Sequence, residues 1–213
     1  MEPVIIVNFK AYREATARDA EALAKMIEKY CIVAVQNADI YRVSRIARKV
    51  YAQHIDPVGY GAFTGHDTAY CLKENGASGV IINHSEDQMP MDSIKKAVEI
   101  AREAGLETVV CIRTPELVKK VSNFKPDFIA YESPELIGSG ISVTTRPDTI
   151  KKVIELAGGK TPVLCGAGIT KADDVRKAIA LGCSGIVVAS GVVKASNPAA
   201  VISSFRQASG CVQ

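Results

Sequence analysis

The chain has 213 residues, of which 47% are hydrophobic and 23% charged, and its net charge is +3 at pH 7. These values are ordinary for one soluble domain with a sizeable core. The basic residues are spread along the chain without a basic patch or an aromatic stacking motif, which argues against a nucleic-acid partner. No apolar run approaches the ~20 residues that cross a bilayer, so no membrane partner is expected.

The start of the chain, Met1-Glu2-Pro3, lacks the charged lead and long apolar core of a signal peptide. The six cysteines, at positions 31, 71, 111, 165, 183 and 211, occur singly and form no C-x-x-C pair. Cys111 and Cys165 fall inside strand-like runs and are interpreted as buried apolar residues. We therefore expect a cytoplasmic protein with reduced cysteines.

Eight short apolar runs are predicted as strands buried on both faces. In chain order they cover residues 4–7, 31–35, 51–55, 79–82, 108–112, 127–130, 162–165 and 185–188. A segment with apolar residues at helical spacing follows each run. These predicted helices cover residues 16–28, 40–50, 68–75, 93–104, 115–121, 147–157, 171–181 and 199–207.

Alternating strands and helices with wholly apolar strands imply a parallel sheet covered on both faces. Eight such units without a break in composition predict a closed (β/α)8 barrel, formed as a single α/β domain by residues 1–213. A doubly wound open sheet is the alternative. The absence of a G-x-G-x-x-G motif after the first strand argues against it.

In such a barrel, chemistry gathers at the carboxyl ends of the strands. The residues at those ends are Asn8, Lys10, His84, Glu132, Gly168, Ala189 and Ser190. Glu132 follows the sixth strand and precedes an X-Pro bond and the segment Gly138-Ser139-Gly140. A carboxylate on a rigid strand end, followed by a loop with a glycine tip, predicts a base beneath a closing lid.

Two other strand-end side chains complement this base. Lys10 is a cation able to meet a phosphate and a developing oxyanion, and the amide of Asn8 can hold Lys10 or the ligand. His84 precedes a helix-like start, where the helix dipole disfavours a second positive charge, so a neutral imidazole is expected. A surface lysine and a structural histidine are the alternatives, and we interpret His54 and His66 as structural.

Two glycine-containing turns precede helices and offer backbone amides to a phosphate dianion. They are Gly166-Ala167-Gly168 and Ala189-Ser190-Gly191. The turns predict a phosphate site and do not identify the reaction.

Five motifs, in this order, resemble the triosephosphate isomerase family in its short archaeal form. They are Val7-Asn8-Phe9-Lys10, Gly61-Ala62-Phe63-Thr64-Gly65, Asn83-His84-Ser85-Glu86, Glu132 with Ile137-Gly138-Ser139-Gly140, and Gly166-Ala167-Gly168-Ile169. The resemblance spans essentially the whole chain. It implies a TIM barrel that interconverts dihydroxyacetone phosphate and D-glyceraldehyde 3-phosphate through an enediol(ate), in glycolysis and gluconeogenesis, with no metal and no cofactor.

The resemblance also implies residue roles. Glu132 is the base that moves a proton between two carbons, and His84 is the electrophile that polarises the carbonyl, a pairing known for this family together with its closing loop. The implied substrate-binding residues are Asn8, Phe9, Lys10, Ile137, Gly138, Gly168, Ala189 and Ser190. The family is homo-oligomeric, so we expect a dimer or tetramer in which the loop at residues 61–65 reaches the neighbouring subunit.

The sequence departs from the family pattern at two places. Ser133 follows the base where the family usually has proline, which predicts a less rigid lid hinge. Asp87 and Gln88 follow Glu86 where the family commonly has two arginines, so the charge contacts of that segment differ. A sugar-phosphate epimerase or synthase would need metal ligands or another acid set, and a barrel without catalysis would have a replaced base or electrophile.

Overall fold

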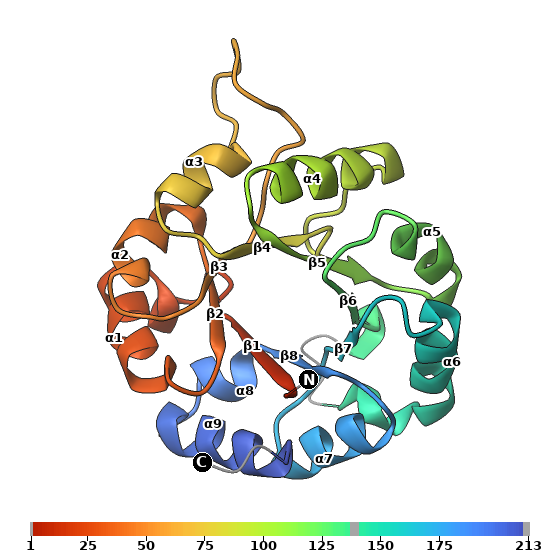
Figure 1. The fold of residues 1–213 in the computed structure, drawn as a ribbon. Coiled ribbons are helices and arrows are strands. Elements are labelled where there is room, and N and C mark those ends of the chain that lie inside the picture. The colour runs from red at the N-terminus through yellow and green to blue at the C-terminus, as the bar shows by residue number, and fades with distance from the viewer. Residues whose placement is uncertain (1, 137–140, 211–213) are drawn as a thin grey trace.

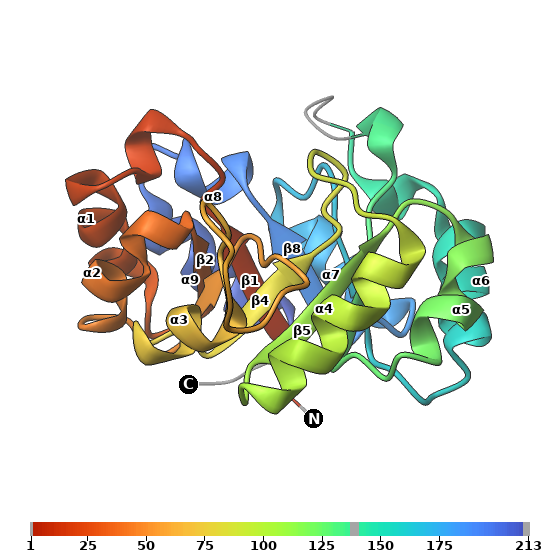
Figure 2. The same ribbon diagram turned by 90° about the horizontal axis from the view of Figure 1, so that it is seen from above.

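The computed structural model describes residues 2–136 and 141–210. Eight parallel strands pair in chain order and close into a barrel, with the helices arranged round the outside (Figures 1 and 2). Closure is made by the first and last strands, where Val4 pairs with Gly185 and Val7 with Val188. The predicted closed (β/α)8 barrel is confirmed, because an open sheet would leave these two strands unpaired.

The strands are β1 (Val4–Asn8), β2 (Ile32–Val35), β3 (Val50–Ala52), β4 (Gly79–Ile82), β5 (Glu107–Ile112), β6 (Phe128–Tyr131), β7 (Val163–Cys165) and β8 (Gly185–Val188). The α-helices are α1 (Arg18–Ile27), α2 (Ile40–Ser44), α3 (Ala69–Glu74), α4 (Met91–Glu103), α5 (Val118–Ser122), α6 (Pro147–Ala157), α7 (Ala172–Ala180), α8 (Ser190–Val193) and α9 (Pro198–Ala208). No helix in this described part of the chain is long and apolar enough to cross a membrane.

Alternate strand residues face two separate hydrophobic clusters. One set, including Ile6 and Ala130, fills the barrel interior, and the other packs beneath the helices. Because side chains alternate along a strand, the inward parity of Ile6 continues to Asn8, and that of Ala130 continues to Glu132. The packing of the barrel therefore aims both polar residues at its carboxyl end.

The region between β2 and β3 differs from its prediction. The helix expected at residues 40–50 ends at Ser44, whose hydroxyl donates to the carbonyl oxygens of Tyr41 and Asn75, both at 3.1 Å. Val50 belongs to β3 and pairs with Val33. The helix must end early because β3 has to reach its partner strand.

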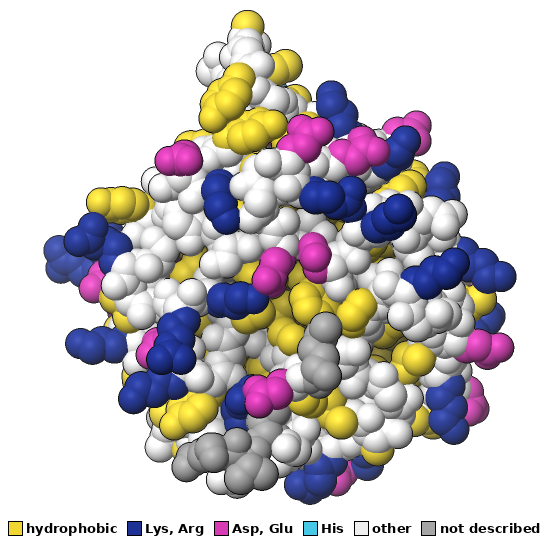
Figure 3. Space-filling view, viewed as in Figure 1, with side chains coloured by type: hydrophobic (Ala, Val, Ile, Leu, Met, Phe, Trp, Pro, Cys, Tyr) yellow, Lys and Arg dark blue, Asp and Glu magenta, His cyan; other side chains and the backbone are white. Residues whose placement is uncertain are grey.

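The segment between β3 and α3 extends away from the barrel (Figure 1). Its two ends are joined by the Asp56 amide, which donates to the Asp67 carbonyl at 3.0 Å. Tyr60 and Phe63 lie on this segment with 79% and 49% of their surface exposed. Hydrophobic side chains gather on it in the space-filling view (Figure 3).

Candidate active site

A cavity of about 330 Å³ lies at the carboxyl ends of the strands. Its lining residues are Asn8, Lys10, Tyr12, His84, Glu86, Glu132, Ala167, Gly168, Ile169, Thr170, Val187, Val188, Ala189 and Ser190. The seven strand-end residues picked out in the sequence are all among them. The barrel thus brings together side chains and turns from four of its strands, β1, β4, β6 and β8, and from the turn after β7.

Glu132 is buried, with 5% of its surface exposed. Burial raises the pKa of its carboxyl group, and the neighbouring His84 and Lys10 oppose that effect. Its Oε2 lies 3.3 Å from Nε2 of His84. This oxygen has no hydrogen-bond partner among the described residues. A buried carboxylate oxygen that faces a cavity without a partner is suited to accept a proton.

The orientation of His84 is set by the turn that follows it. The Glu86 amide donates to Nδ1 of His84 at 3.2 Å, so Nδ1 is the acceptor nitrogen. The proton of the neutral imidazole is therefore on Nε2, which faces Glu132. This arrangement fits the neutral imidazole expected from the sequence, because a protonated Nδ1 could not accept that bond.

Lys10 is held from two sides. Its backbone amide donates to Oδ1 of Asn8 at 3.0 Å. Of the two roles expected for the Asn8 side chain, holding Lys10 or holding the ligand, the structure shows the first. Its ammonium group lies 2.9 Å from Oε2 of Glu86. Only 15% of the Lys10 side chain is exposed. These contacts fix a cation at the cavity rather than on the solvated surface.

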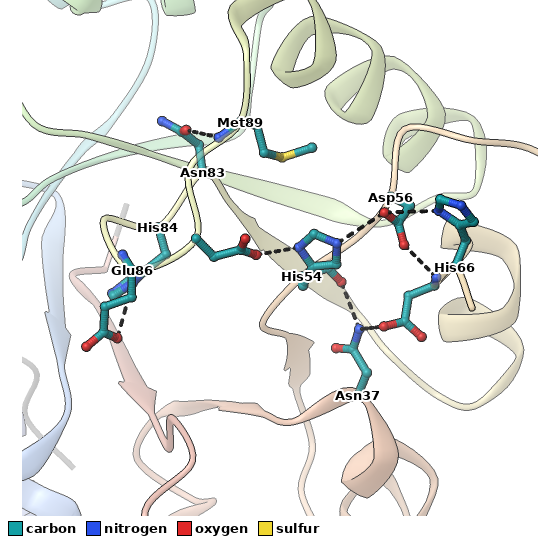
Figure 4. A network of polar contacts seen from close by, with 10 residues as sticks. Asn37, His54, Asp56, His66, Asn83, His84, Glu86 and Met89 are labelled. Atoms are coloured by element: carbon teal, nitrogen blue, oxygen red, sulfur yellow. Dashed lines mark hydrogen bonds and ion pairs between the residues drawn. The ribbon is translucent and has the colours of Figure 1, made fainter. Parts of the chain in front are cut away.

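Three residues of the loops at the strand ends adopt left-handed backbone conformations that favour glycine. The φ angles are 48° for Lys10, 61° for Asn83 and 73° for Ala167. Such conformations cost on the order of 1–3 kcal/mol each and cluster at functional sites. Asn83 is held there by its side chain, which accepts from the Met89 amide at 2.9 Å (Figure 4).

The turn after β7 approaches its neighbours closely at two glycines. A Cβ on Gly166 would lie 2.7 Å from Cγ of Glu132, and a Cβ on Gly168 would lie 1.9 Å from the carbonyl oxygen of Ile141. Gly168 also has φ of 67°. Glycine at these positions therefore lets the turn pack against both the carboxylate and the segment that follows the predicted lid.

Other predicted residues stand apart from the cavity. Phe9 is fully buried in the core, and its amide donates to the carbonyl of Ala34 at 2.8 Å, so its part in substrate binding stays a prediction. Ile137 and Gly138 lie outside the described residues. The lining residues that the sequence did not single out are Tyr12, Thr170, Val187 and Val188. The signal in the sequence that could have found them is their position within two residues of the motifs and strand-end turns.

The barrel and its cavity define a class of protein, a (β/α)8-barrel enzyme that sets a buried carboxylate against a neutral imidazole. The triosephosphate isomerase family model matches residues 3–205. The chain belongs to the triosephosphate isomerase family. Its activity is accordingly triosephosphate isomerase activity, an aldose–ketose isomerisation.

Similarity to individual members of the family supports this assignment. The chain is 40% identical to the triosephosphate isomerase of Methanosarcina barkeri over 212 residues, covering 94% of this chain and 96% of that protein. It is 42% identical to that of Methanobacterium bryantii, covering 92% of each. The crystal structure of the Bartonella henselae triosephosphate isomerase has the same fold, with a TM-score of 0.75, 22% identity, and coverage of 97% of this chain and 100% of that one.

Proposed function

We propose that Glu132 and His84 carry out the isomerisation of dihydroxyacetone phosphate and D-glyceraldehyde 3-phosphate. The ionised Glu132 takes a proton from the carbon beside the carbonyl, and the bonding electrons move onto the carbonyl oxygen to form an enediolate. Nε2–H of His84 donates to that oxygen. The hydroxyl proton on the first carbon then passes, by way of His84, to the former carbonyl oxygen, and Glu132 returns the carbon proton to the neighbouring carbon. A new carbonyl forms on the first carbon, which completes the exchange between ketose and aldose.

The single observation that carries this proposal is the 3.3 Å approach of His84 Nε2 to Glu132 Oε2 inside the cavity. Oε2 of Glu132 lacks a hydrogen-bond partner among the described residues and can accept a proton. Nε2 of His84 carries the imidazole proton and can donate a hydrogen bond. Both are therefore within reach of adjacent atoms of one small substrate. The Lys10 ammonium adds positive charge where the oxyanion develops.

We assign phosphate binding to the backbone amides at Gly168, Ala189 and Ser190. All three residues line the cavity, and Ser190 is the first residue of α8, where an amide has no partner within the helix. Ile137 and Gly138, outside the described residues, complete the assignment as the lid. Asn8, the last residue of β1, and Phe9, which follows it, complete the proposed substrate-binding residues beside Lys10.

The lid hinge in this assignment includes Ser133. The Ser133 side chain is buried, and its hydroxyl accepts from Nη1 of Arg146 at 3.3 Å. Nη2 of Arg146 also pairs with Oε2 of Glu135 at 2.5 Å. The arginine thus restrains the first turn after Glu132, where the family usually has proline.

We further propose a homo-oligomer, dimer or tetramer, formed through the loop at residues 61–65. A second cavity of about 250 Å³ adjoins the first and shares Asn8, Lys10, His84 and Glu86 with it. It offers a place for the same loop of a neighbouring subunit. The exposed Phe63 gives that loop an apolar surface to bury. We place the enzyme in the cytoplasm, in glycolysis and gluconeogenesis.

A coupled assay tests the reaction. The purified protein receives D-glyceraldehyde 3-phosphate, and the appearance of dihydroxyacetone phosphate is followed through a dehydrogenase that consumes it. We expect turnover that saturates with substrate. Failure to convert the aldose, in a protein that unfolds cooperatively, would contradict the proposed function.

A further inference from the structure

His54 lies outside the substrate cavity but contacts the segment that carries the electrophile. It follows β3, and its Nδ1 lies 2.6 Å from Oδ2 of Asp87, from the turn after β4. Because Asp87 can only accept when ionised, His54 is the donor. Its other ring nitrogen lies 3.5 Å from Oδ1 of Asp56 (Figure 4). The imidazole thus lies between two carboxylates.

The partner Asp87 is part of the turn that orients His84. The Asp87 amide donates to the His84 carbonyl at 2.8 Å. The preceding residue, Glu86, donates its amide to Nδ1 of His84 and pairs its carboxylate with Lys10 at 2.9 Å. A displacement of Asp87 therefore moves the amide that fixes the His84 tautomer.

His54 itself is anchored at the base of the extended loop. Its carbonyl accepts from Nδ2 of Asn37 at 3.1 Å, and the same nitrogen contacts Oδ2 of Asp67 at 2.8 Å. The Asp67 amide donates to Oδ2 of Asp56 at 2.8 Å. These bonds give the imidazole a fixed backbone from which to hold Asp87.

We propose that His54 is a positioning residue for the isomerisation, acting through Asp87 to hold the His84–Glu86 turn in its catalytic orientation. The sequence offers a reason for this contact. The family commonly has arginine where this chain has Asp87, and an arginine there could not accept a hydrogen bond from His54. The inference rests on the proposed role of His84.

The size of the effect is limited by solvent. The His54 and Asp87 side chains are 33% and 59% exposed, and exposed pairs are weak. The Asp87 amide bond to His84 also remains when the side chain is removed. We therefore expect His54→Ala and Asp87→Ala each to lower kcat about fivefold with KM changed less than about twofold, since the electrophile acts mainly in the transition state.

Four variants beside the wild type test the proposal: His54→Ala, Asp87→Ala, the double variant and His54→Asn. The amide nitrogen of asparagine stands near the place of Nδ1 and can donate to Asp87, so His54→Asn should restore kcat to within about twofold of wild type. The kcat of the double variant should be no lower than that of either alanine variant, because each of the three variants removes the same His54–Asp87 contact. Lys95→Ala is the control, since Lys95 forms an exposed ion pair with Glu99 on α4 at 3.8 Å and should leave kcat unchanged.

Nitrogen-15 spectra of the His84 imidazole give a readout that does not depend on turnover, with His84→Gln used to assign the signals. We expect His54→Ala to weaken the Nε2-protonated signature and His54→Asn to keep it. A His54→Ala protein with wild-type kcat and spectrum, or additive losses in the double variant, would overturn the inference. A wild-type protein without isomerase activity would instead overturn the proposed function.

Discussion

Nε2 of His84 and Oε2 of Glu132 face each other at 3.3 Å although they follow different strands, β4 and β6. The contact depends on two separate features. Inward parity along β6 directs Glu132 into the barrel end, and the Glu86 amide turns the His84 ring so that its protonated nitrogen points the same way. Fold and local hydrogen bonding therefore converge on one pair of atoms.

The raised pKa of Glu132 predicts how stability varies with pH. Burial is the main cause of the shift, so the folded protein keeps this proton to higher pH than the unfolded chain does. The stabilising contribution is complete below the unfolded pKa and is lost as pH rises through the folded pKa. Glu132→Gln removes it. Its melting temperature relative to wild type should therefore rise as pH increases from about 4, the pKa of an ordinary glutamate, through the raised folded pKa of Glu132.

Calorimetry at several pH values checks this, with the exposed Glu74→Gln as a control for the loss of one negative charge. A difference between Glu132→Gln and wild type that stays constant with pH, or that falls as pH rises, would contradict the burial of an ionisable carboxyl group. In the wild type, kcat/KM should fall on the acid side at a pH above that of an ordinary glutamate, because only the ionised form is a base.

Gly168→Ala should impair catalysis. Its Cβ would stand 1.9 Å from the Ile141 carbonyl oxygen, so the turn after β7 and the segment that contains Ile141 must separate. We expect kcat/KM to fall at least about tenfold, because small displacements at a reacting site are costly.

Gly159→Ala is the matched control, since Gly159 has a similar φ of 69° but no heavy atom within 4 Å of an added Cβ. Both variants introduce backbone strain, but only Gly168→Ala adds a steric clash. Comparing the steady-state kinetics and the thermal unfolding of the two variants therefore separates the effect of strain from that of the clash. Equal kinetic losses in the two variants would show that the contact with Ile141 is not the cause.

The loop at residues 61–65 should form a subunit interface. Phe63→Asp places a charge on its exposed apolar ring, and we expect the oligomer to dissociate at micromolar concentration with loss of activity per chain. Light scattering measures the mass. Tyr41→Asp, at a 58% exposed residue on α2, is the control and should leave the mass unchanged. A wild-type monomer of 22.7 kDa with full activity would refute the interface.

Isomerisation should continue with excess chelator and without added nucleotide. The sequence has no metal-ligand spacing and no dinucleotide fingerprint. In the described ranges, no group of three or more His, Cys, Asp or Glu side chains could hold a metal ion. Initial rates before and after dialysis against chelator make the comparison. Activity that is lost on dialysis and restored by a divalent ion would show that the reaction needs a metal.

The barrel and the strand-end residues of its cavity could be predicted from the sequence because both follow from short-range patterns. Apolar runs alternate with amphipathic segments, and polar residues such as Asn8 and Glu132 stand directly at the ends of those runs. Strand order then follows chain order, so strand ends can be collected at one edge without knowing any long-range contact.

Other features depend on contacts that no local pattern encodes. The left-handed conformation of Lys10 runs against the preference of its residue type and is held by the Asn8 side chain. His54 and Asp87 meet across 33 residues through two irregular loops, so the interpretation of His54 as merely structural overlooked its partner. The end of α2 at Ser44 likewise depends on the distant carbonyl of Asn75.

The most direct test of the account is turnover per folded molecule of Glu132→Asp and Glu132→Gln. Aspartate keeps the charge but withdraws it by one methylene, which should lower kcat ~10²-fold, and glutamine removes the base and should cost more. Both proteins should fold and keep their affinity for substrate, since the amides proposed to bind the phosphate are unchanged. Normal turnover by Glu132→Gln would show that another group is the base.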